Sequence, residues 1–316
     1  MSDLTPTPAG RHFVAEFDES SLGEVDALDE SVPPSSLWKE ASRKLIRRPL
    51  FIVAAVLILV ILAVALFPQL FSSGDPNAGC YIDNARKGPG PGHPLGFERQ
   101  GCDIYTRIIH GARPSVLVGV LAMVAVLVLG GTVGALAGWY GRWLDAVLSR
   151  VGDIFYAIPT ILAALVFLNS QRGKTGVGSV VLVIAAFAWP QMARITRSAV
   201  LAVKHADFVT ASRALGVSRF TILRRHVLPN AAAPMIVMAT TSLGSYIVME
   251  ATLSFLGLGL PITTRSWGWQ ISDAKSLLRT NPEILFWPSA ALALTVLAFI
   301  MLGDAVRDAL DPKARR

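Results

Sequence analysis

The sequence predicts an all-α polytopic membrane protein with six transmembrane helices. Of its 316 residues, 53% are hydrophobic and only 16% are charged, whereas soluble domains are nearer a quarter charged. Six uncharged apolar runs are each close to the length that crosses the hydrocarbon core of a bilayer, about 30 Å. The net charge of +7 comes from basic residues that gather between alternate runs, so it favours a membrane protein over a nucleic-acid binder.

Residues 1–36 precede the apolar runs and differ from them. They hold eight acidic residues and a single Lys or Arg, Arg11, without an apolar stripe at helical spacing. Because such a segment buries too little apolar surface to fold, we predict a disordered acidic cytoplasmic tail. It is no signal peptide, since that would need a basic start followed by an apolar run.

The apolar runs divide the rest of the chain. Residues 37–71 form a basic juxtamembrane segment with the first helix, residues 72–114 an extracytoplasmic segment rich in Gly and Pro, and residues 115–316 the other five helices and a long loop at 194–230. Hydrocarbon cannot satisfy a bare peptide group, so each run is interpreted as a helix. The alternative, buried helices of a large soluble core, would need runs of about 10–14 residues. The predicted spans are Leu50–Phe67, Val116–Gly141, Ile154–Gln171, Val177–Ala193, Ala231–Met249 and Ile284–Gly303.

Basic residues orient these spans. With a cytoplasmic N-terminus, the inner segments (1–49, 142–153, 194–230 and 304–316) carry 19 Lys and Arg, against 10 in the outer segments (68–115, 172–176 and 250–283). Lys and Arg set the orientation and acidic residues weigh little. We therefore expect a multi-pass protein with both termini in the cytoplasm.

The inner loop at 194–230 contains apolar residues at helical spacing. Gly216 can adopt the positive φ of a turn between two short helices, and Pro229 is expected to stop the second helix before the fifth span. The pattern predicts a helical elbow with an apolar ridge among arginines. It is either a docking surface or a solvated basic loop that obeys the positive-inside rule. The ridge consists of Phe208, Ala211, Leu215, Phe220, Leu223 and Val227, and the arginines are Arg213, Arg219, Arg224 and Arg225.

The stretch "TASRALGVSRFTILRRHVLPN" (Thr210–Asn230) resembles the conserved cytoplasmic loop of ABC-importer permeases, which opens on Glu-Ala-Ala and continues to a Gly and an Ile-x-Leu-Pro ending. Gly216, Leu228 and Pro229 match that pattern, while Thr210 and His226 depart from it. Further stretches are similar to the C-type permease of dipeptide and oligopeptide importers, from about Leu45 to the C-terminus. They are "HPLGFERQGCDIYTRIIHGARPSVLVG" (93–119), "GALAGWYGRWLDAVLSRVGDIFYAIP" (134–159), "TLSFLGLGLP" (252–261), "WGW" (267–269) and "GDAVRDALDP" (303–312).

The resemblance implies a type I ABC-importer permease in the cytoplasmic (inner) membrane of a prokaryote. Its implied partners are a second homologous permease subunit, two P-loop ATPase subunits that use ATP and Mg, an extracytoplasmic substrate-binding lipoprotein or protein, a peptide substrate and membrane lipid. The loop would be the coupling helix, seated in a groove of an ATPase subunit, with Pro229 as a structural residue of the elbow. The implied coupling residues are Phe208, Ala211, Ser212, Ala214, Leu215, Gly216 and Phe220.

Three alternatives remain open at this point. The same architecture can import nickel or another small cargo. A stand-alone secondary transporter would show paired interrupted helices and intramembrane charges, and an intramembrane enzyme would need a second catalytic group within reach. We expect no catalytic residue and no bound cofactor, because the "GKT" at Gly173–Thr175 has Leu168 where a phosphate-binding loop needs its first Gly. Five scattered His and two Cys predict no metal site.

Glu250 and the two cysteines are further candidates. A carboxylate deep in a span costs about 2.5–3.5 kcal/mol on insertion scales, so Glu250 either gates or lines a path, or lies at the outer interface satisfied by Ser254 or backbone groups. Cys80 and Cys102 lie on the oxidising side, where a disulfide would contribute roughly 3 kcal/mol; two unrelated thiols are the alternative. Gly134 and Gly138, four apart in the second span, predict close helix packing.

Overall fold

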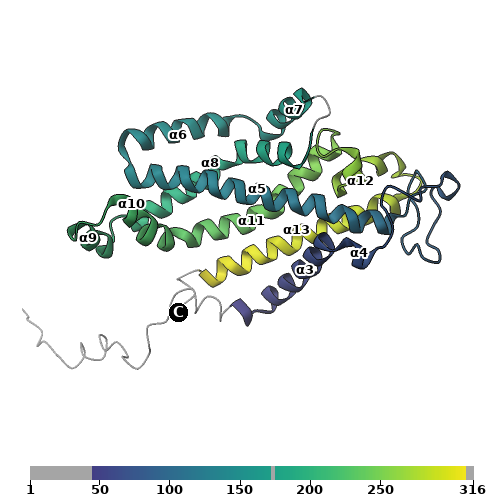
Figure 1. The fold of residues 1–316 in the computed structure, drawn as a ribbon, viewed down its shortest axis with the longest axis horizontal. Coiled ribbons are helices and arrows are strands. Elements are labelled where there is room, and N and C mark those ends of the chain that lie inside the picture. The colour runs from purple at the N-terminus through teal and green to yellow at the C-terminus, as the bar shows by residue number, and fades with distance from the viewer. Residues whose placement is uncertain (1–44, 172–174, 311–316) are drawn as a thin grey trace, which may run out of the picture. The chain divides into compact units, whose positions relative to one another are not determined.

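The long helices lie lengthwise beside one another in the computed structural model, which describes residues 45–171 and 175–310. The predicted tail at 1–36 and Gly173 lie outside the described residues. Figure 1 shows α5, α8, α11 and α13 side by side, with α6 and α7 along one side and α3 along the other. The helices are α3 (Pro49–Leu66), α4 (Pro68–Phe71), α5 (Ile104–Tyr140), α6 (Arg142–Ala157), α7 (Thr160–Ser170), α8 (Val177–Val203), α9 (Asp207–Ala214), α10 (Arg219–Ile222), a π-helical turn (Leu223–Val227), α11 (Leu228–Phe255), α12 (Trp267–Ala274) and α13 (Pro282–Leu310), with short 3-10 turns at Ile82–Asn84, Ile262–Thr264 and Lys275–Leu277.

The third predicted span, Ile154–Gln171, is not a continuous helix. Within residues 45–171 and 175–310, five helices are long and apolar enough to cross a membrane, and α6 with α7 makes a sixth candidate that is bent by 80°. Proline lacks an N–H donor and disfavours the helical conformation in the residue before it. Ile158, which precedes Pro159, is accordingly extended, with φ −84° and ψ 121°. The fold is therefore all-helical with five to six candidate spans.

The helix α5 begins well before the predicted start of its span at Val116. Asp103 caps its N-terminus, where the Asp103 carboxylate accepts a hydrogen bond from the Thr106 N–H at 2.8 Å. Such a cap satisfies one of the backbone donors left free at a helix start. The segment expected at 72–114 thus ends in the first turns of α5, which continue through Pro114.

Glycines on one face of α5 bring its backbone against α8. A Cβ added at Gly130 would lie 2.6 Å from the Trp189 carbonyl oxygen, and one at Gly138 would lie 3.0 Å from the Arg197 carbonyl oxygen. A Cβ at Gly134, midway between them, would overlap the Ala193 carbonyl. Small residues four apart permit this close approach, so α5 and α8 are in tight backbone contact along the bundle.

We predict that Gly134→Leu separates α5 from α8 and lowers the melting temperature of the purified protein in detergent. Overpacking a tight contact costs about 1–3 kcal/mol or more. The matched control is Gly178→Leu in α8, because a Cβ at Gly178 meets nothing within 4 Å. Intrinsic tryptophan fluorescence during heating measures both variants, and equal melting temperatures would contradict the tight contact.

Candidate functional site

The elbow predicted within the loop at 194–230 is a helix–turn–helix whose turn depends on Gly216. Gly216 has φ +76° and separates α9 from α10. The Gly216 N–H donates to the Arg213 carbonyl at 3.0 Å and the Val217 N–H donates to the Ser212 carbonyl at 3.2 Å. This pair of hydrogen bonds is the Schellman motif, which satisfies free carbonyls at a helix end and favours glycine at the left-handed position.

The second half of the elbow differs from the prediction for Pro229. The helix α10 does not stop there but continues through the π-helical turn into α11, so that Arg219–Phe255 forms one run of 37 residues. Pro229 lies in the first turn of α11. The preceding turn is wider, because the Leu228 N–H reaches back to the Leu223 carbonyl. This turn accommodates a proline without redirecting the chain, and the prediction that Pro229 ends the helix is wrong.

The inner face of the elbow packs on the adjoining ends of α5 and α8. Trp139 of α5 is 4% exposed, and the Arg213 guanidinium lies 5.0 Å from the centre of its ring. Leu223 and Val227, predicted as part of the apolar ridge, are buried in this core. The buried cluster contains Ala135, Trp139, Val200, Val209, Ile222, Leu223, Val227 and Ala231.

The outer face of the elbow remains apolar and exposed. Leu215 is 82% exposed, Phe220 is 61% exposed and Phe208 is 43% exposed. Together with the exposed Ala211 and Ala214, they form what we name the elbow patch. The four arginines predicted around it, Arg213, Arg219, Arg224 and Arg225, are also exposed. An apolar patch with a charged rim is typical of an interaction surface.

Ser212 and Gly216 are predicted coupling residues that do not add an apolar side chain to the elbow patch. The Ser212 hydroxyl donates to the Phe208 carbonyl within α9 at 2.7 Å, so it is committed to its own helix. Gly216 is exposed at the turn, and a Cβ there would meet nothing within 4 Å. Replacing Gly216 therefore acts through backbone conformation rather than through a clash.

Glu250 lies inside the bundle rather than on an exposed surface. It is 0% exposed, and the Ser254 hydroxyl donates to its Oε1 atom at 2.7 Å. Ser254 in turn accepts hydrogen bonds from the Leu260 N–H at 3.2 Å and from the Ser266 hydroxyl at 3.4 Å. Ser254 thus satisfies one carboxylate oxygen, while Oε2 is buried without a hydrogen-bond partner among the described residues, and the Ser254 hydrogen bonds tie α11 to the connection that leads into α12.

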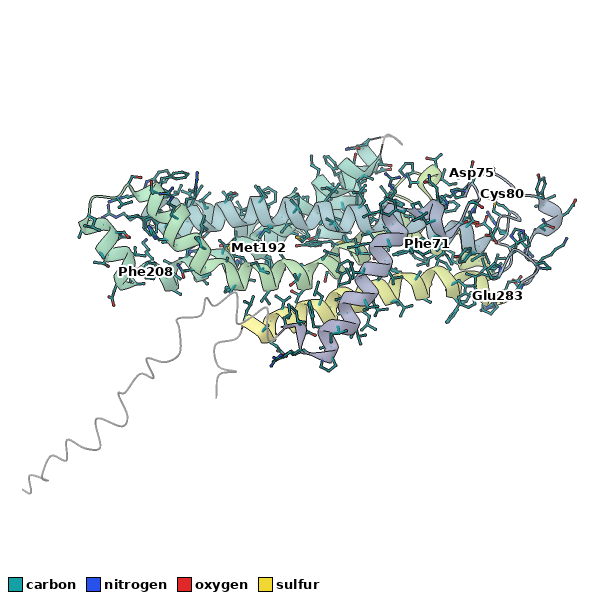
Figure 2. The ribbon with its side chains drawn as sticks, turned by 60° about the horizontal axis from the view of Figure 1, so that its bottom comes forward. Phe71, Asp75, Cys80, Met192, Phe208 and Glu283 are labelled. Atoms are coloured by element: carbon teal, nitrogen blue, oxygen red, sulfur yellow. A yellow bond between two sulfur atoms is a disulfide. The ribbon has the colours of Figure 1, made fainter. Side chains whose placement is uncertain are left out.

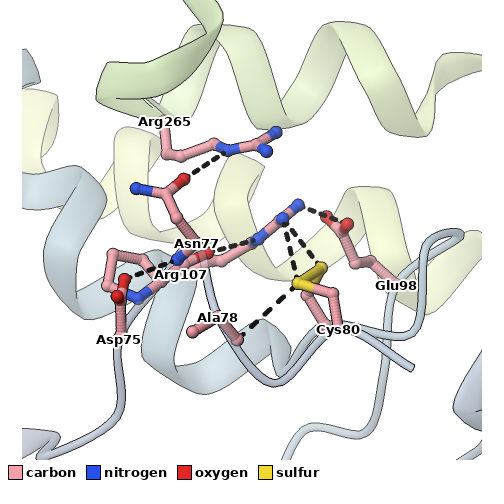
Figure 3. Close-up of a disulfide and its surroundings, with 9 residues drawn as sticks. Asp75, Asn77, Ala78, Cys80, Glu98, Arg107 and Arg265 are labelled. Carbon is pink, nitrogen blue, oxygen red and sulfur yellow. Dashed lines mark hydrogen bonds and ion pairs between the residues drawn. A yellow bond between two sulfur atoms is a disulfide. The ribbon is translucent and has the colours of Figure 1, made fainter.

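Cys80 and Cys102 are bonded at the end of the bundle opposite the elbow, as the labels of Phe208 and Cys80 in Figure 2 show. The Arg107 guanidinium lies between this disulfide and Glu98 (Figure 3). It pairs with the Glu98 carboxylate, and its Nη2 donates to the Cys102 Sγ atom at 2.8 Å. Burial raises the pKa of Glu98 and the Arg107 charge opposes this rise, so the pair forms a desolvated anchor for the segment before α5.

The sequence does not predict this anchor, because Arg107 falls in the extracytoplasmic segment expected at 72–114. Its side chain is 2% exposed and its Nε also donates to the Pro76 carbonyl at 3.1 Å. From α12, Gln270 Nε2 donates to the carbonyls of Arg107 and Arg265, both at 2.8 Å. The helix-start signal at Asp103 was the feature that would have placed Arg107 inside a helix.

A bundle of apolar helices that carries an elbow with an exposed apolar patch is the arrangement of a multi-pass membrane protein. Residues 130–316 match the family described as "binding-protein-dependent transport system inner membrane component", and residues 36–89 match the "N-terminal TM domain of oligopeptide transport permease C". The chain belongs to the binding-protein-dependent ABC permeases, in the family of dipeptide and oligopeptide permeases.

Curated relatives match nearly the whole chain. It is 37% identical to the dipeptide transport system permease protein DppC of Alkalihalophilus pseudofirmus, over 89% of this chain and 91% of that protein. It is 35% identical to the oligopeptide transport system permease protein OppC of Bacillus subtilis, over 95% and 97% respectively. It is 34% identical to the glutathione transport system permease protein GsiD of Pectobacterium atrosepticum, over 88% and 92%.

A solved structure shares the fold. A chain from "Inward facing conformations of the MetNI methionine ABC transporter" superimposes with a TM-score of 0.54 at 22% identity, covering 65% of this chain and 96% of that one. The chain is thus a multi-pass inner membrane protein with the architecture of an ABC-importer permease. Subunits of this family are not catalytic and bind no cofactor, because a partner ATPase uses the ATP; a binding protein is the other implied partner.

We predict that the Cys80–Cys102 disulfide forms in the membrane-inserted protein. The two Cα atoms lie 4.1 Å apart and Cys102 is 1% exposed, so the thiols have no other partner within reach. Peptide mapping by mass spectrometry without reduction should give one linked peptide that separates after reduction. Two free thiols in protein alkylated before purification would contradict the pairing.

Proposed function

We propose that the chain is the permease subunit of an ATP-driven importer that moves dipeptides or oligopeptides across the cytoplasmic membrane. The observation that carries the proposal is the match along nearly the full length to permeases named for dipeptide, oligopeptide and glutathione transport. These three cargoes are all short peptides. Uptake of nickel or another small cargo by the same architecture is the alternative, and it has no comparable support in these names.

The elbow patch is the proposed docking site for an ATPase subunit. Phe208, Leu215 and Phe220 point away from a packed base, so a partner can bury them without unfolding the elbow. The arginine rim suits a groove lined by acidic groups. Because α8 and α11 leave the elbow without a flexible linker, movement of the ATPase subunit would be carried directly into the spans.

The proposed assembly contains a second homologous permease, two ATPase subunits and an extracytoplasmic binding protein, with the transport path between the two permeases. Both termini are assigned to the cytoplasm. The excess of Lys and Arg in the inner segments supports this orientation. The ion pair between Arg48, just before α3, and Asp308, near the end of α13, at 2.5 Å puts the start of α3 and the end of α13 on the same side of the bundle, which this orientation requires.

Gly216→Leu should leave membrane insertion intact, abolish peptide uptake and remove the stimulation of ATP hydrolysis by the binding protein. A side chain at φ +76° costs roughly 1–2 kcal/mol, which is enough to distort the turn without unfolding the bundle. The readouts are uptake of labelled peptide and ATP hydrolysis by the complex in proteoliposomes. Gly216→Asn is the control, since asparagine tolerates the left-handed conformation. Normal uptake by the leucine variant would overturn the coupling role.

Leu215→Asp should weaken binding of the ATPase subunit by about tenfold or more, because a carboxylate cannot be buried in an apolar contact without a large desolvation cost. Co-purification at increasing ATPase concentration measures the affinity. The matched control is Leu278→Asp, which replaces a leucine that is 56% exposed away from the elbow and should leave binding unchanged. Equal affinities of the two variants would locate the docking surface elsewhere.

A further inference from the structure

The helix α6 is unusual in how little of it is buried. Within its 16 residues Gly152 is the buried one, although the helix is strongly amphipathic. Its apolar side chains remain open, with Trp143 73% exposed and Ile154 63% exposed. Since apolar side chains facing lipid add no force that holds one helix on another, the position of α6 depends on a small number of specific contacts.

Those contacts are ion pairs with α8 together with the Phe155 ring, whose centre lies 5.7 Å from that of Phe187 and 5.8 Å from that of Trp189. Arg197 binds Asp145 through two parallel hydrogen bonds, Nε to Oδ1 at 2.5 Å and Nη2 to Oδ2 at 2.7 Å. Arg194 Nη2 donates to Asp153 Oδ1 at 2.8 Å, and the Arg194 guanidinium lies 4.6 Å from the centre of the Tyr156 ring. Asp145 and Asp153 are eight residues apart, close to two helical turns, so both carboxylates face α8.

Space for movement lies directly behind these ion pairs. A cavity of about 350 Å³ separates α6 from the α5–α8 pair. Gly134 and Ala137 of α5 line one wall, Ser149 and Gly152 of α6 line another, and Arg197 of α8 borders it. A helix held by partly exposed ion pairs over a cavity can change position without first breaking a close-packed core.

The ion pairs also connect the two moving parts of a coupled transporter. Arg197 lies on α8, which leads through Lys204–Ala206 into the elbow. Asp145 lies on α6, which forms the broken candidate span with α7. The Lys204 ammonium donates to the Gly138 carbonyl at 3.0 Å, so α5 and α8 stay together at this level and α6 is the element free to separate from them.

We propose that Arg197 and Asp145, with Arg194 and Asp153 beside them, form a latch that holds α6 on α8 and must open in each transport cycle. The four residues are positioning residues for transport. This inference rests on the proposed function, because it assumes that movement enters the protein through the elbow. It assigns to the broken span a movement relative to the α5–α8 pair.

A reversible cross-link tests the proposal. A Cβ added at Gly152 lies 3.7 Å from the Pro190 Cβ, which is within the range of disulfides, and the two native cysteines are already bonded to each other. In proteoliposomes with the partner subunits, oxidation of a Gly152→Cys/Pro190→Cys variant should reduce peptide uptake by about tenfold or more, as expected when a required movement is blocked. Reduction should restore uptake. The single variants, and the wild type treated with the same oxidant and reductant, are the controls.

Full cross-linking with uptake still within about twofold of the reduced form would overturn the latch, since α6 would then not need to move. ATP hydrolysis by the same samples separates this failure from failure of the proposed function. If the wild type takes up no peptide yet the binding protein stimulates its ATPase, the cargo is wrong. The latch then predicts that the cross-link removes this stimulation, and unchanged stimulation would overturn it.

Charge reversal gives a second test that does not need a new cysteine. Asp145→Arg and Arg197→Asp each place like charges together, so each should release α6. The rate of ATP hydrolysis should then rise without a matching rise in peptide uptake. The double variant restores an opposite pair and should return both activities toward the wild type. A double variant no better than the single variants would show that the ion pair has no positioning role.

Discussion

The contact between α5 and α8 is the constraint on which the other parts of the structure depend. Three glycines of α5 let its backbone touch backbone carbonyls of α8, and no other residue type allows that distance. One end of this pair carries the packed base of the elbow, through Trp139 and Val200. At the other end, the first turns of α5 hold Arg107. The two helices thus form a fixed frame against which other elements can be positioned or moved.

The two ends of this frame are stabilised by different interactions. At the disulfide end, a covalent bond and a buried ion pair fix the segment before α5. Removing one partner of such a pair typically costs about 3–5 kcal/mol, because the other charge remains buried. At the elbow end, apolar packing fixes the base while Leu215 and Phe220 stay exposed. A rigid cap at one end and an open surface at the other suit a subunit that receives its driving movement from one side.

Hydropathy and turn chemistry predicted the helical fold, five of the six spans and the glycine turn, because these depend on local residue patterns. Pro159 in the sequence favours a break in the helix, but the uncharged run around it predicts one continuous span. The burial of Leu223 and Val227 was not predictable from the apolar ridge, since they lie in a π-helical turn that packs on α5 and α8, and such a turn has no clear sequence signature. The ion pairs of Arg107 and Arg197 were missed for a different reason. Their partners lie on other segments, and only the fold shows which segments are adjacent.

The uninterrupted run from Arg219 to Phe255 has a mechanical consequence. Its 37 residues make a rod of about 55 Å at the rise of an α-helix. One tip of this rod is Phe220 in the elbow patch, and near the other Glu250 and Ser254 bind the connection to α12. A tilt imposed at the first tip must appear as a displacement at the second, with the π-helical turn as the one wider joint between them. The elbow patch and the connection to α12 are therefore joined by a single length of helix.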